Sequence, residues 1–315
     1  MIGELAALGA SCCWAVGSHL FGRIGRSGEV PPGAMNLGKC LTAMALFALT
    51  ASVIGAVGGH VVPIVSLRAA GWLLASGFVG LALGDGAYFQ AIVTIGVRRA
   101  LLLLSTAPVF AAIGGALWLG ERLGVREWAA ILAVMLGVGV VVEERDASPA
   151  PGNDRASSLP AAPAPTRLTT AGVLFGVAAG LGQAAGSLMS RAAMAEGVTA
   201  LDAALVRLPA GVVGIVILAV LSRRLVGYTR ALRRSGVMGA VAGSAAIGTY
   251  LGIWLSQFAI GHAESTAVAS TLLATSPIFA LPLGKWLNAD RISPRALGGT
   301  MVACAGLMLL TLGRK

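Results

Sequence analysis

The sequence predicts an all-α integral membrane protein with ten transmembrane helices, arranged as two inverted five-helix repeats. Three observations carry this prediction: a very apolar composition, a series of long apolar runs, and a motif that occurs twice. Of the 315 residues, 57% are hydrophobic and 11% are charged, and the mean hydropathy is +0.85. Soluble domains carry about 25% charged residues, so this composition indicates a chain that lies mostly in lipid.

The apolar runs are about as long as the roughly 20 residues that a helix needs to cross a bilayer. They are rich in Gly and Ala and show no alternation of polar and apolar residues, which favours helices over the strands of a membrane barrel. In chain order, the ten predicted spans cover residues 3–22, 34–56, 69–92, 99–119, 125–142, 170–190, 200–221, 236–260, 265–287 and 295–312.

The longest polar stretch begins at Glu143 and ends at Thr169, and it contains "EERDASPAPGNDRASSLPAAPAPTR". Its Pro, Ser and charged residues offer no apolar face for packing, which predicts a flexible linker. It falls between the fifth and sixth spans. The predicted organisation is therefore a first repeat at 1–142, a linker at 143–169 and a second repeat at 170–315.

Two stretches show the doubling: "STAPVFAAIGGALWLGER", which begins at Ser105, and "ATSPIFALPLGKWLNADR", which begins at Ala274. Six residues recur 169 positions later: Thr106, Pro108, Phe110, Ala111, Gly115 and Arg122 match Thr275, Pro277, Phe279, Ala280, Gly284 and Arg291. The offset also holds near the start of each half, and it slips to 168 in the middle, where Gly84 matches Gly252. Because five is odd, the second half must enter the membrane upside down relative to the first. Inverted repeats of this kind are typical of transporters that work by alternating access.

With a Pro in each fourth span and an acidic residue before Arg in each following turn, the chain resembles the EamA family of the drug/metabolite transporter superfamily. The resemblance covers both halves and leaves out the linker. The first copy has the family's Gly-Glu turn at Gly120–Glu121, whereas the second has Ala289–Asp290. Members of the family move amino acids, metabolites and drugs, so the resemblance implies transport of a small solute without naming it.

The repeated motifs also yield local predictions. Glu121 and Asp290 stand at helix ends, where charged groups anchor or cap helices. Pro108 and Pro277 are predicted to kink their helices, because a mid-helix Pro removes a backbone hydrogen bond. The freed carbonyl groups then either face a cavity or accept hydrogen bonds from neighbouring Thr side chains.

Three charged residues lie more than one helical turn from the ends of the predicted spans: Lys39, Asp85 and Arg207. Each costs about 2.5–3.5 kcal/mol at the centre of an inserting helix, so each is a candidate for function. Asp85 is interpreted either as a proton or cation site or as a structural partner of a cation such as Lys39. Lys39 and Arg207 are repeat-equivalent; they either bind an anionic group such as a carboxylate or extend toward an interface. For Arg207, just before Pro209, extension is the favoured alternative.

Further candidates for a midplane cavity are polar and aromatic residues within the spans: Trp14, Tyr88, Gln183, Tyr250, Trp254 and Gln257. Trp14 and Gln183 are repeat-equivalent, and Tyr88 lies one helical turn after Asp85. Hydroxyl and amide groups in lipid also bond neighbouring helices, so a cavity and helix packing remain alternative roles for these side chains.

No motif for a metal, a cofactor or catalysis is present: the four cysteines lie in apolar spans without metal-ligand spacing, and the three histidines are scattered. The net charge of +10 bears on orientation rather than on nucleic acid. Of the Lys and Arg residues other than Lys39 and Arg207, 15 lie in odd-numbered loops or at the span ends beside them, and 6 lie in or beside even-numbered loops and the tail. This distribution favours both termini outside the cell, whereas the resemblance implies both termini inside, and the two orientations stay open.

Together these patterns predict a secondary transporter in the cell membrane that moves an amino acid or a related small metabolite, with export favoured. One alternative is a proton-coupled multidrug or amine carrier that uses Asp85. A less favoured alternative is a membrane scaffold or lipid-handling protein that moves no solute. The expected partners are a small solute, a proton and the lipid bilayer; neither nucleic acid nor a cofactor is expected, and the oligomeric state stays open.

Overall fold

The computed structural model describes residues 2–26, 30–57, 63, 65–95, 100, 103–143, 169–276, 278–279, 282–283 and 294–311. Every regular element among them is helical. In chain order the elements are α1 (Ile2–Arg26), α2 (Pro32–Ala56), α3 (Leu67–Ser76), η1 (Gly77–Gly84), α4 (Asp85–Ile95), α6 (Ala107–Gly114), η2 (Gly115–Leu119), α7 (Val125–Glu143), α8 (Thr170–Met194), α9 (Ala200–Leu221), α10 (Leu225–Leu232), α11 (Val237–Ala245), η3 (Ala246–Leu251), α12 (Gly252–His262), α13 (Thr266–Leu273) and α15 (Pro294–Thr311). The predicted linker, apart from its two end residues, lies outside the described residues.

Six helices in the described part of the chain are long and apolar enough to cross a membrane: Ile2–Gly25, Pro32–Ala56, Leu67–Ile95, Thr170–Met194, Ala200–Leu221 and Val237–His262. They correspond to predicted spans one, two, three, six, seven and eight. The apolar helices Ala107–Leu119 and Leu297–Gly306 are shorter. The protein is therefore an all-helical, multi-pass membrane protein.

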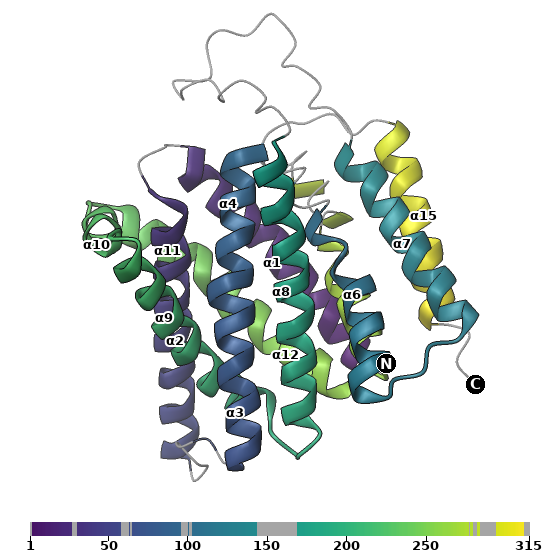
Figure 1. The fold of residues 1–315 in the computed structure, drawn as a ribbon, viewed down its shortest axis with the longest axis horizontal. Coiled ribbons are helices and arrows are strands. Elements are labelled where there is room, and N and C mark those ends of the chain that lie inside the picture. The colour runs from purple at the N-terminus through teal and green to yellow at the C-terminus, as the bar shows by residue number, and fades with distance from the viewer. Residues whose placement is uncertain are drawn as a thin grey trace, which may run out of the picture.

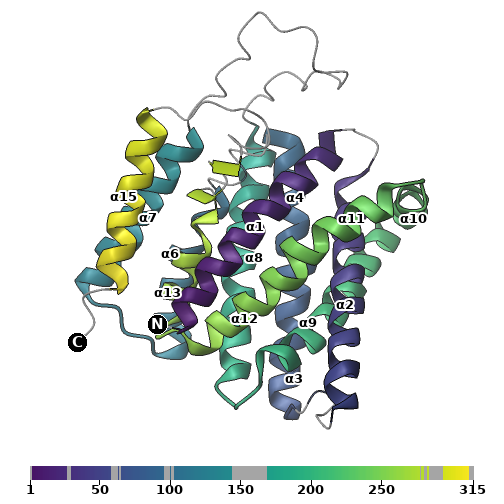
Figure 2. The ribbon, with the colours of Figure 1, turned by 180° about the vertical axis from the view of Figure 1, so that it is seen from behind.

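Most helices form a single bundle, and one pair stands at its edge. In Figures 1 and 2, α7 and α15 lie side by side at this edge, and they pack through Gly137. A β-carbon at Gly137 would lie 2.4 Å from the backbone nitrogen of Ala303, so these two backbones are in direct contact. The start of α1 and the end of α15 lie at the same end of the bundle, and α10 lies toward the other end (Figure 1).

The two halves cross each other at two glycine pairs. Gly17 of α1 meets Gly248 of η3, and a β-carbon on either residue would lie 2.6 Å from the Cα of the other. Gly186 of α8 meets Gly80 of η1, where a β-carbon on Gly186 would lie 3.0 Å from the Cα of Gly80. Gly186 is the counterpart of Gly17, and Gly248 is the counterpart of Gly80. The first helix of each half therefore crosses the third span of the other half by the same contact.

Each of these crossings involves a π-helical segment. The backbone N–H of Asp85 donates to the carbonyl of Gly80, five residues back, where η1 ends. The segment η3 occupies the equivalent part of the second half. A π-helical turn widens the helix and disturbs its hydrogen-bond ladder, and such turns occur frequently at functional sites.

The fourth spans are interrupted rather than kinked in the middle. A turn at Ser105–Thr106 precedes α6, and Pro108 lies in the first turn of that helix, where a missing N–H costs nothing. The prediction that Pro108 kinks a helix from its middle is therefore wrong. The hydroxyl of Thr106 donates to the carbonyl of Leu103 over 2.6 Å, a carbonyl that the Thr106 N–H also bonds; the predicted pairing of a carbonyl freed by Pro108 stays a prediction. Pro277 lies outside the described residues.

The same interruption follows α13, where Ala274 and Thr275 form a turn. The hydroxyl of Thr275 donates to the carbonyl of Leu272 over 2.6 Å, which repeats the Thr106 contact 169 positions later. Thr275 also shares a 3.0 Å hydrogen bond with the hydroxyl of Ser11 on α1. The repeated motif therefore fixes the same local structure in both halves.

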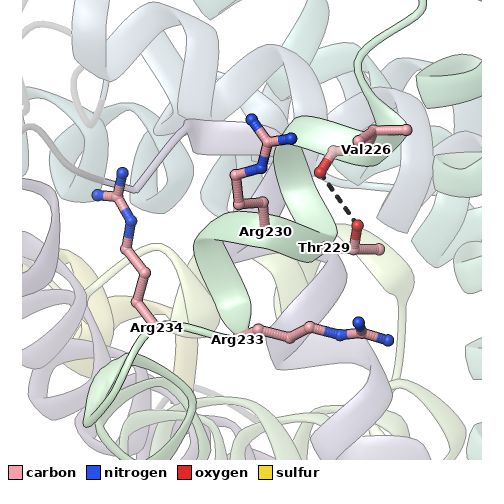
Figure 3. Close-up of a pocket in the computed structure, with 5 residues that line it drawn as sticks. All are labelled: Val226, Thr229, Arg230, Arg233 and Arg234. Carbon is pink, nitrogen blue, oxygen red and sulfur yellow. Dashed lines mark hydrogen bonds between the residues drawn. The ribbon is translucent and has the colours of Figure 1, made fainter.

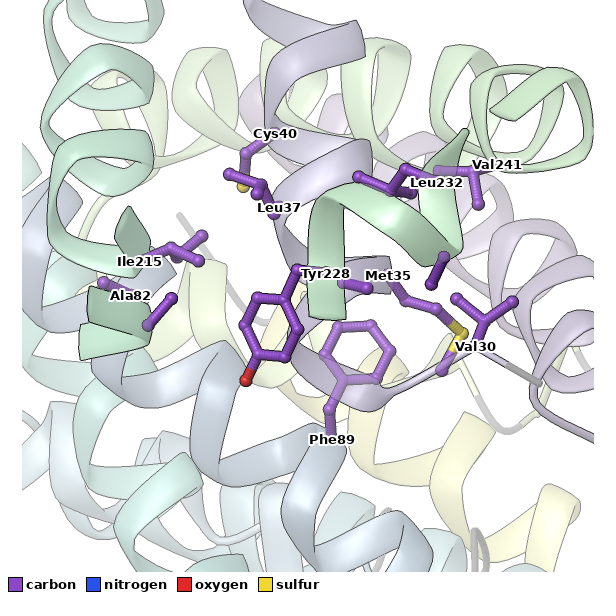
Figure 4. Packing of buried hydrophobic residues seen from close by; sticks show 13 residues of the cluster. Val30, Met35, Leu37, Cys40, Ala82, Phe89, Ile215, Tyr228, Leu232 and Val241 are labelled. Carbon is purple, nitrogen blue, oxygen red and sulfur yellow. The ribbon is translucent and has the colours of Figure 1, made fainter. Parts of the chain in front are cut away.

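The short helix α10 was not among the predicted elements. Tyr228 and Leu232 of α10 are buried, whereas Val226 is 67% exposed, so one face of the helix packs and the other does not. Figure 4 shows Tyr228 directed into a cluster that includes Phe89 of α4 and Leu37 of α2. The apolar residues on one side of "LVGYTRAL" were the available signal for this helix.

Candidate functional site

Two of the three charged residues well inside the predicted spans form an ion pair. The Nζ of Lys39 on α2 lies 2.6 Å from Oδ2 of Asp85 at the start of α4. The side chains are 12% and 21% exposed, respectively. The Lys39 Nζ also lies 5.3 Å from the ring centroid of Phe89, a distance suited to a cation–π contact. Asp85 is thus held by a cation in this structure, which is one of the two roles that the sequence left open for it.

An amide next to the pair holds α2 against the π-helical segment. Asn36 is buried, and its Nδ2 donates to the carbonyl of Leu81 over 3.1 Å. Leu81 lies in η1, where the hydrogen-bond ladder departs from the α-helical pattern. Asn36 is one turn before Cys40, whose Sγ donates weakly to the Asn36 Oδ1 over 3.8 Å. Sequence reasoning did not select Asn36, although an amide within an apolar run was the signal for it.

Arg207 lies beside the ion pair without joining it. Its side chain belongs to α9, and the residue is only 8% exposed. A β-carbon built on Gly80 would lie 3.2 Å from the Nη2 of Arg207, which places the guanidinium at the crossing of η1 and α8. Arg207 and Asp85 interact electrostatically. The favoured prediction, that Arg207 extends toward an interface, is wrong, because close contact between α9 and η1 encloses the side chain.

Three aromatic side chains gather between α2 and the third span of the second half. Tyr250 lies 4.7 Å from Phe47 and 5.8 Å from Trp254 between ring centroids. The hydroxyl of Tyr250 shares a 2.6 Å hydrogen bond with Thr50. Tyr250 and Trp254 therefore lie together, with polar contact as well as packing. Phe47, which is fully buried, was not selected from the sequence.

The remaining candidates are spread over three helices. Tyr88 on α4 is half-buried against Ala91 and Ile95 and interacts electrostatically with Asp85. Trp14 on α1 packs on Gly252, where a β-carbon would lie 2.5 Å from the indole ring. Gln183 on α8 is half-buried next to the crossing at Gly182.

Gln257 on α12 is fully buried, and neither atom of its amide has a hydrogen-bond partner among the described residues. A buried amide without partners is costly, so Gln257 is an energetic exception among the described residues. The hydroxyl of Ser270 on α13 is also buried without a partner in the described part of the chain.

Glu121 has a structural role, as its place in the turn predicted. Its Oε1 accepts hydrogen bonds from the backbone N–H of Thr266 over 2.9 Å and from the Thr266 hydroxyl over 2.7 Å. The carboxylate thereby caps the N-terminus of α13, which belongs to the other half. Gly120, with φ of 66°, forms the left-handed turn before it. The charge of Glu121 also suits the positive end of the helix dipole.

Two hollows lie at the surface of the described structure, and residues other than the ion pair line them. One is lined by Val226, Thr229, Arg230, Arg233 and Arg234 of α10 and the turn after it. In Figure 3, the side chains of the three arginines extend in different directions, and Thr229 bonds the Val226 carbonyl. The second lies around Glu121, Arg122 and Trp128. No group of three or more His, Cys, Asp or Glu residues within the described ranges is placed to hold a metal ion.

A model of the EamA-like transporter family matches residues 1–143 and again residues 170–312. The chain belongs to the EamA-like transporter family. It contains the family's unit twice, and it is a multi-pass membrane transporter rather than an enzyme.

Two further comparisons accompany this membership. The riboflavin transporter of Vibrio cholerae serotype O1 (strain ATCC 39315 / El Tor Inaba N16961) is 38% identical to this EamA protein over 47 residues, which are 15% of this chain and 16% of that transporter. A solved crystal structure of a protein superposes with a TM-score of 0.69, at 18% identity, over 98% of this chain and 96% of its own. The first comparison covers a small part of both proteins, and the second shows the fold alone.

Proposed function

We propose that this EamA transporter is a secondary transporter that moves an amino acid or a related small metabolite across the cell membrane by alternating access, with export favoured. The observation that carries the proposal is the 2.6 Å Lys39–Asp85 pair, partly buried among the spans, with the buried Arg207 beside it. Charged groups within a membrane are costly and mark solute or proton pathways. A membrane scaffold or lipid-handling protein has no need of them.

The proposed architecture is ten spans in two inverted repeats, 1–142 and 170–315, joined by the linker 143–169. The reciprocal glycine crossings support it, because each half contacts the other through equivalent residues. The start of α1 and the end of α15 also lie at the same end of the bundle (Figure 1). Two ends on one side of a membrane fit an even number of crossings, such as ten. In such folds the solute binds near the midplane, where the repeats meet.

The charged centre lies at such a meeting point. Lys39 and Asp85 come from the first half, and Arg207 comes from the second half. A rocking motion of one half against the other would change the distance between Arg207 and the pair. The proposed site is completed by side chains around this centre and by those of the second half's third span: Trp14, Tyr88, Gln183, Tyr250, Trp254 and Gln257.

A proton-coupled amine or multidrug carrier remains the second candidate. In that mechanism Asp85 binds the cationic solute or a proton in turn. The structure makes this less favoured, because the Lys39 ammonium already occupies the Asp85 carboxylate and would have to be displaced. Riboflavin, the solute named for the Vibrio relative, belongs in any screen, although the matched segment is short.

Transport by purified protein in proteoliposomes tests the proposal, with amino acids, amines and riboflavin as solutes and an imposed pH gradient. Asp85→Asn keeps the shape of the side chain and removes its charge. We expect normal membrane abundance with flux lost or made insensitive to pH. Normal pH-dependent flux by the variant would rule out a coupling role for Asp85, and a collapse of abundance would assign it a structural role only.

A further inference from the structure

We propose that Arg207 binds an anionic group of the transported solute, a carboxylate by the chemistry of the site. The inference rests on the proposed transport function and names the solute class that the charged centre accepts. Its basis is a guanidinium that is more than nine-tenths buried and whose Nε has no hydrogen-bond partner among the described residues.

The charged centre carries more positive than negative charge. Lys39 and Arg207 each carry one positive charge, and Asp85 carries one negative charge. The Asp85 carboxylate lies at 2.6 Å from Lys39, and Arg207 makes no ion pair within the described part of the chain. One positive charge is therefore left without a counter-charge in contact. A buried charge of this kind is expensive unless it is paired, and a monoanionic solute would pair it.

A second arginine in the same structure shows what a purely structural role looks like. Arg191 on α8 is also partly buried, and its guanidinium donates to the carbonyls of Ile260 and Glu264. These carbonyls lie at the end of α12 and just after it, so Arg191 closes a helix end. The Nε of Arg207 has no such acceptor in the described part of the chain, although Arg207 is more deeply buried than Arg191.

The guanidinium of Arg207 is closely enclosed in this conformation, so a ligand would reach it when the two halves move apart, as alternating access requires. Its Nη2 stands over the crossing of Gly80 and Gly186, where neither residue has a side chain. The planar fork of an arginine offers two parallel N–H groups, which match the two oxygens of a carboxylate. A lysine ammonium, by contrast, is a single point of charge. Because the arginine fork can hold two oxygens at once, its geometry favours a carboxylate over a halide.

Matched pairs of probes test this assignment by thermal unfolding of the purified protein in nanodiscs. The pairs are lactate with lactamide and phenylacetate with phenylacetamide, which differ in charge and little in shape. A ligand that binds only the folded state raises the Tm. We expect the carboxylates to raise the Tm of the wild-type protein and the amides to leave it unchanged. A wild-type protein that does not distinguish the two members of any pair would overturn the assignment.

The variant Arg207→Gln is expected to bind the carboxylates at least about tenfold more weakly, because a charged hydrogen bond is lost. The matched control Arg191→Gln should have a lower Tm and yet keep the carboxylate response. If Arg207→Gln distinguished the carboxylates from the amides as well as the wild-type protein does, this result would contradict the inference. If that variant does not accumulate, Arg207→Lys replaces it; it should bind carboxylates several-fold more weakly, and wild-type affinity would overturn the assignment.

Flux measurements separate this inference from the transport function on which it rests. Carboxylate binding without flux of any solute would contradict transport and leave the anion site standing. Flux of neutral or cationic solutes, without carboxylate binding, would contradict the anion site and leave transport standing.

Discussion

Gly17 of α1 and Gly248 of η3 approach so closely that a β-carbon on either residue would lie 2.6 Å from the Cα of the other. Gly186 and Gly80 make the equivalent contact between α8 and η1, with 3.0 Å between the built β-carbon of Gly186 and the Cα of Gly80. Lipid offers no hydrophobic drive for helix association, so close backbone contact through small residues takes its place. These two crossings join the halves of the protein.

Gly17→Ala and Gly248→Ala should therefore destabilise the protein by about 1–3 kcal/mol, the usual cost of forcing extra atoms into a packed site. The measurement is thermal or denaturant unfolding in nanodiscs. Gly243→Ala in α11 is the matched control, since a β-carbon there meets nothing within 4 Å. At that position Ala should be neutral or stabilising by up to about 1 kcal/mol, because Ala is the better helix former. Equal effects at all three positions would contradict the role of the crossings.

The Lys39–Asp85 pair predicts a non-additive result. Asp85→Asn leaves the Lys39 ammonium without its carboxylate, and Lys39→Gln leaves the Asp85 carboxylate without its cation. Losing one partner should cost about 1 kcal/mol, well below the roughly 3–5 kcal/mol of a fully buried pair, because both side chains are partly exposed and solvent screens the pair. The double variant should be more stable than either single one. Unfolding measured for the four proteins gives the coupling, and strict additivity would show that the pair contributes nothing.

Glu121→Gln removes the charge that faces the N-terminus of α13, and Glu121→Ala removes the acceptor of the Thr266 N–H. We expect the Ala variant to lose about 0.5–1 kcal/mol, the low end of the usual cost of a lost N-cap, because Ser265 still accepts from the Val268 N–H, and the Gln variant to lose less. Arg122→Gln, at the exposed neighbouring position, is the control and should leave stability unchanged. Hydrogen exchange of the Thr266 amide is the local readout. An unaltered exchange rate in Glu121→Ala would argue against capping.

The arginines of α10 and its flanking turns predict the orientation in the membrane. All five of Arg223, Arg224, Arg230, Arg233 and Arg234 are exposed, and positive loops stay in the cytoplasm. In a variant without native cysteines, Ser235→Cys should be protected from a membrane-impermeant maleimide in intact cells, and Ala195→Cys should react. Both positions are exposed, and both should react after lysis. The reverse pattern would place both termini inside.

The sequence was sufficient for features that depend on composition and local spacing. Apolar length located α9 at residues 200–221, and the repeated motif indicated matching local structure, which the hydroxyl contacts of Thr106 and Thr275 share. The 169-residue offset indicated that the family's unit occurs twice, and the family matches agree. Such features follow from the chain itself, because a bilayer imposes the same length and the same backbone pairing on every crossing helix.

Contacts between distant parts of the chain were decided only by the tertiary structure. Spacing alone made Lys39 and Arg207 equivalent, yet one pairs with Asp85 over 2.6 Å and the other is buried without an ion-pair partner among the described residues. The capping of α13 by Glu121, 145 positions earlier, was equally hidden. Apolar helices resemble one another, so their sequences do not encode which faces meet. That choice depends on where glycines let backbones touch, as Gly80 and Gly186 do, because an added methyl group there would meet the opposite helix.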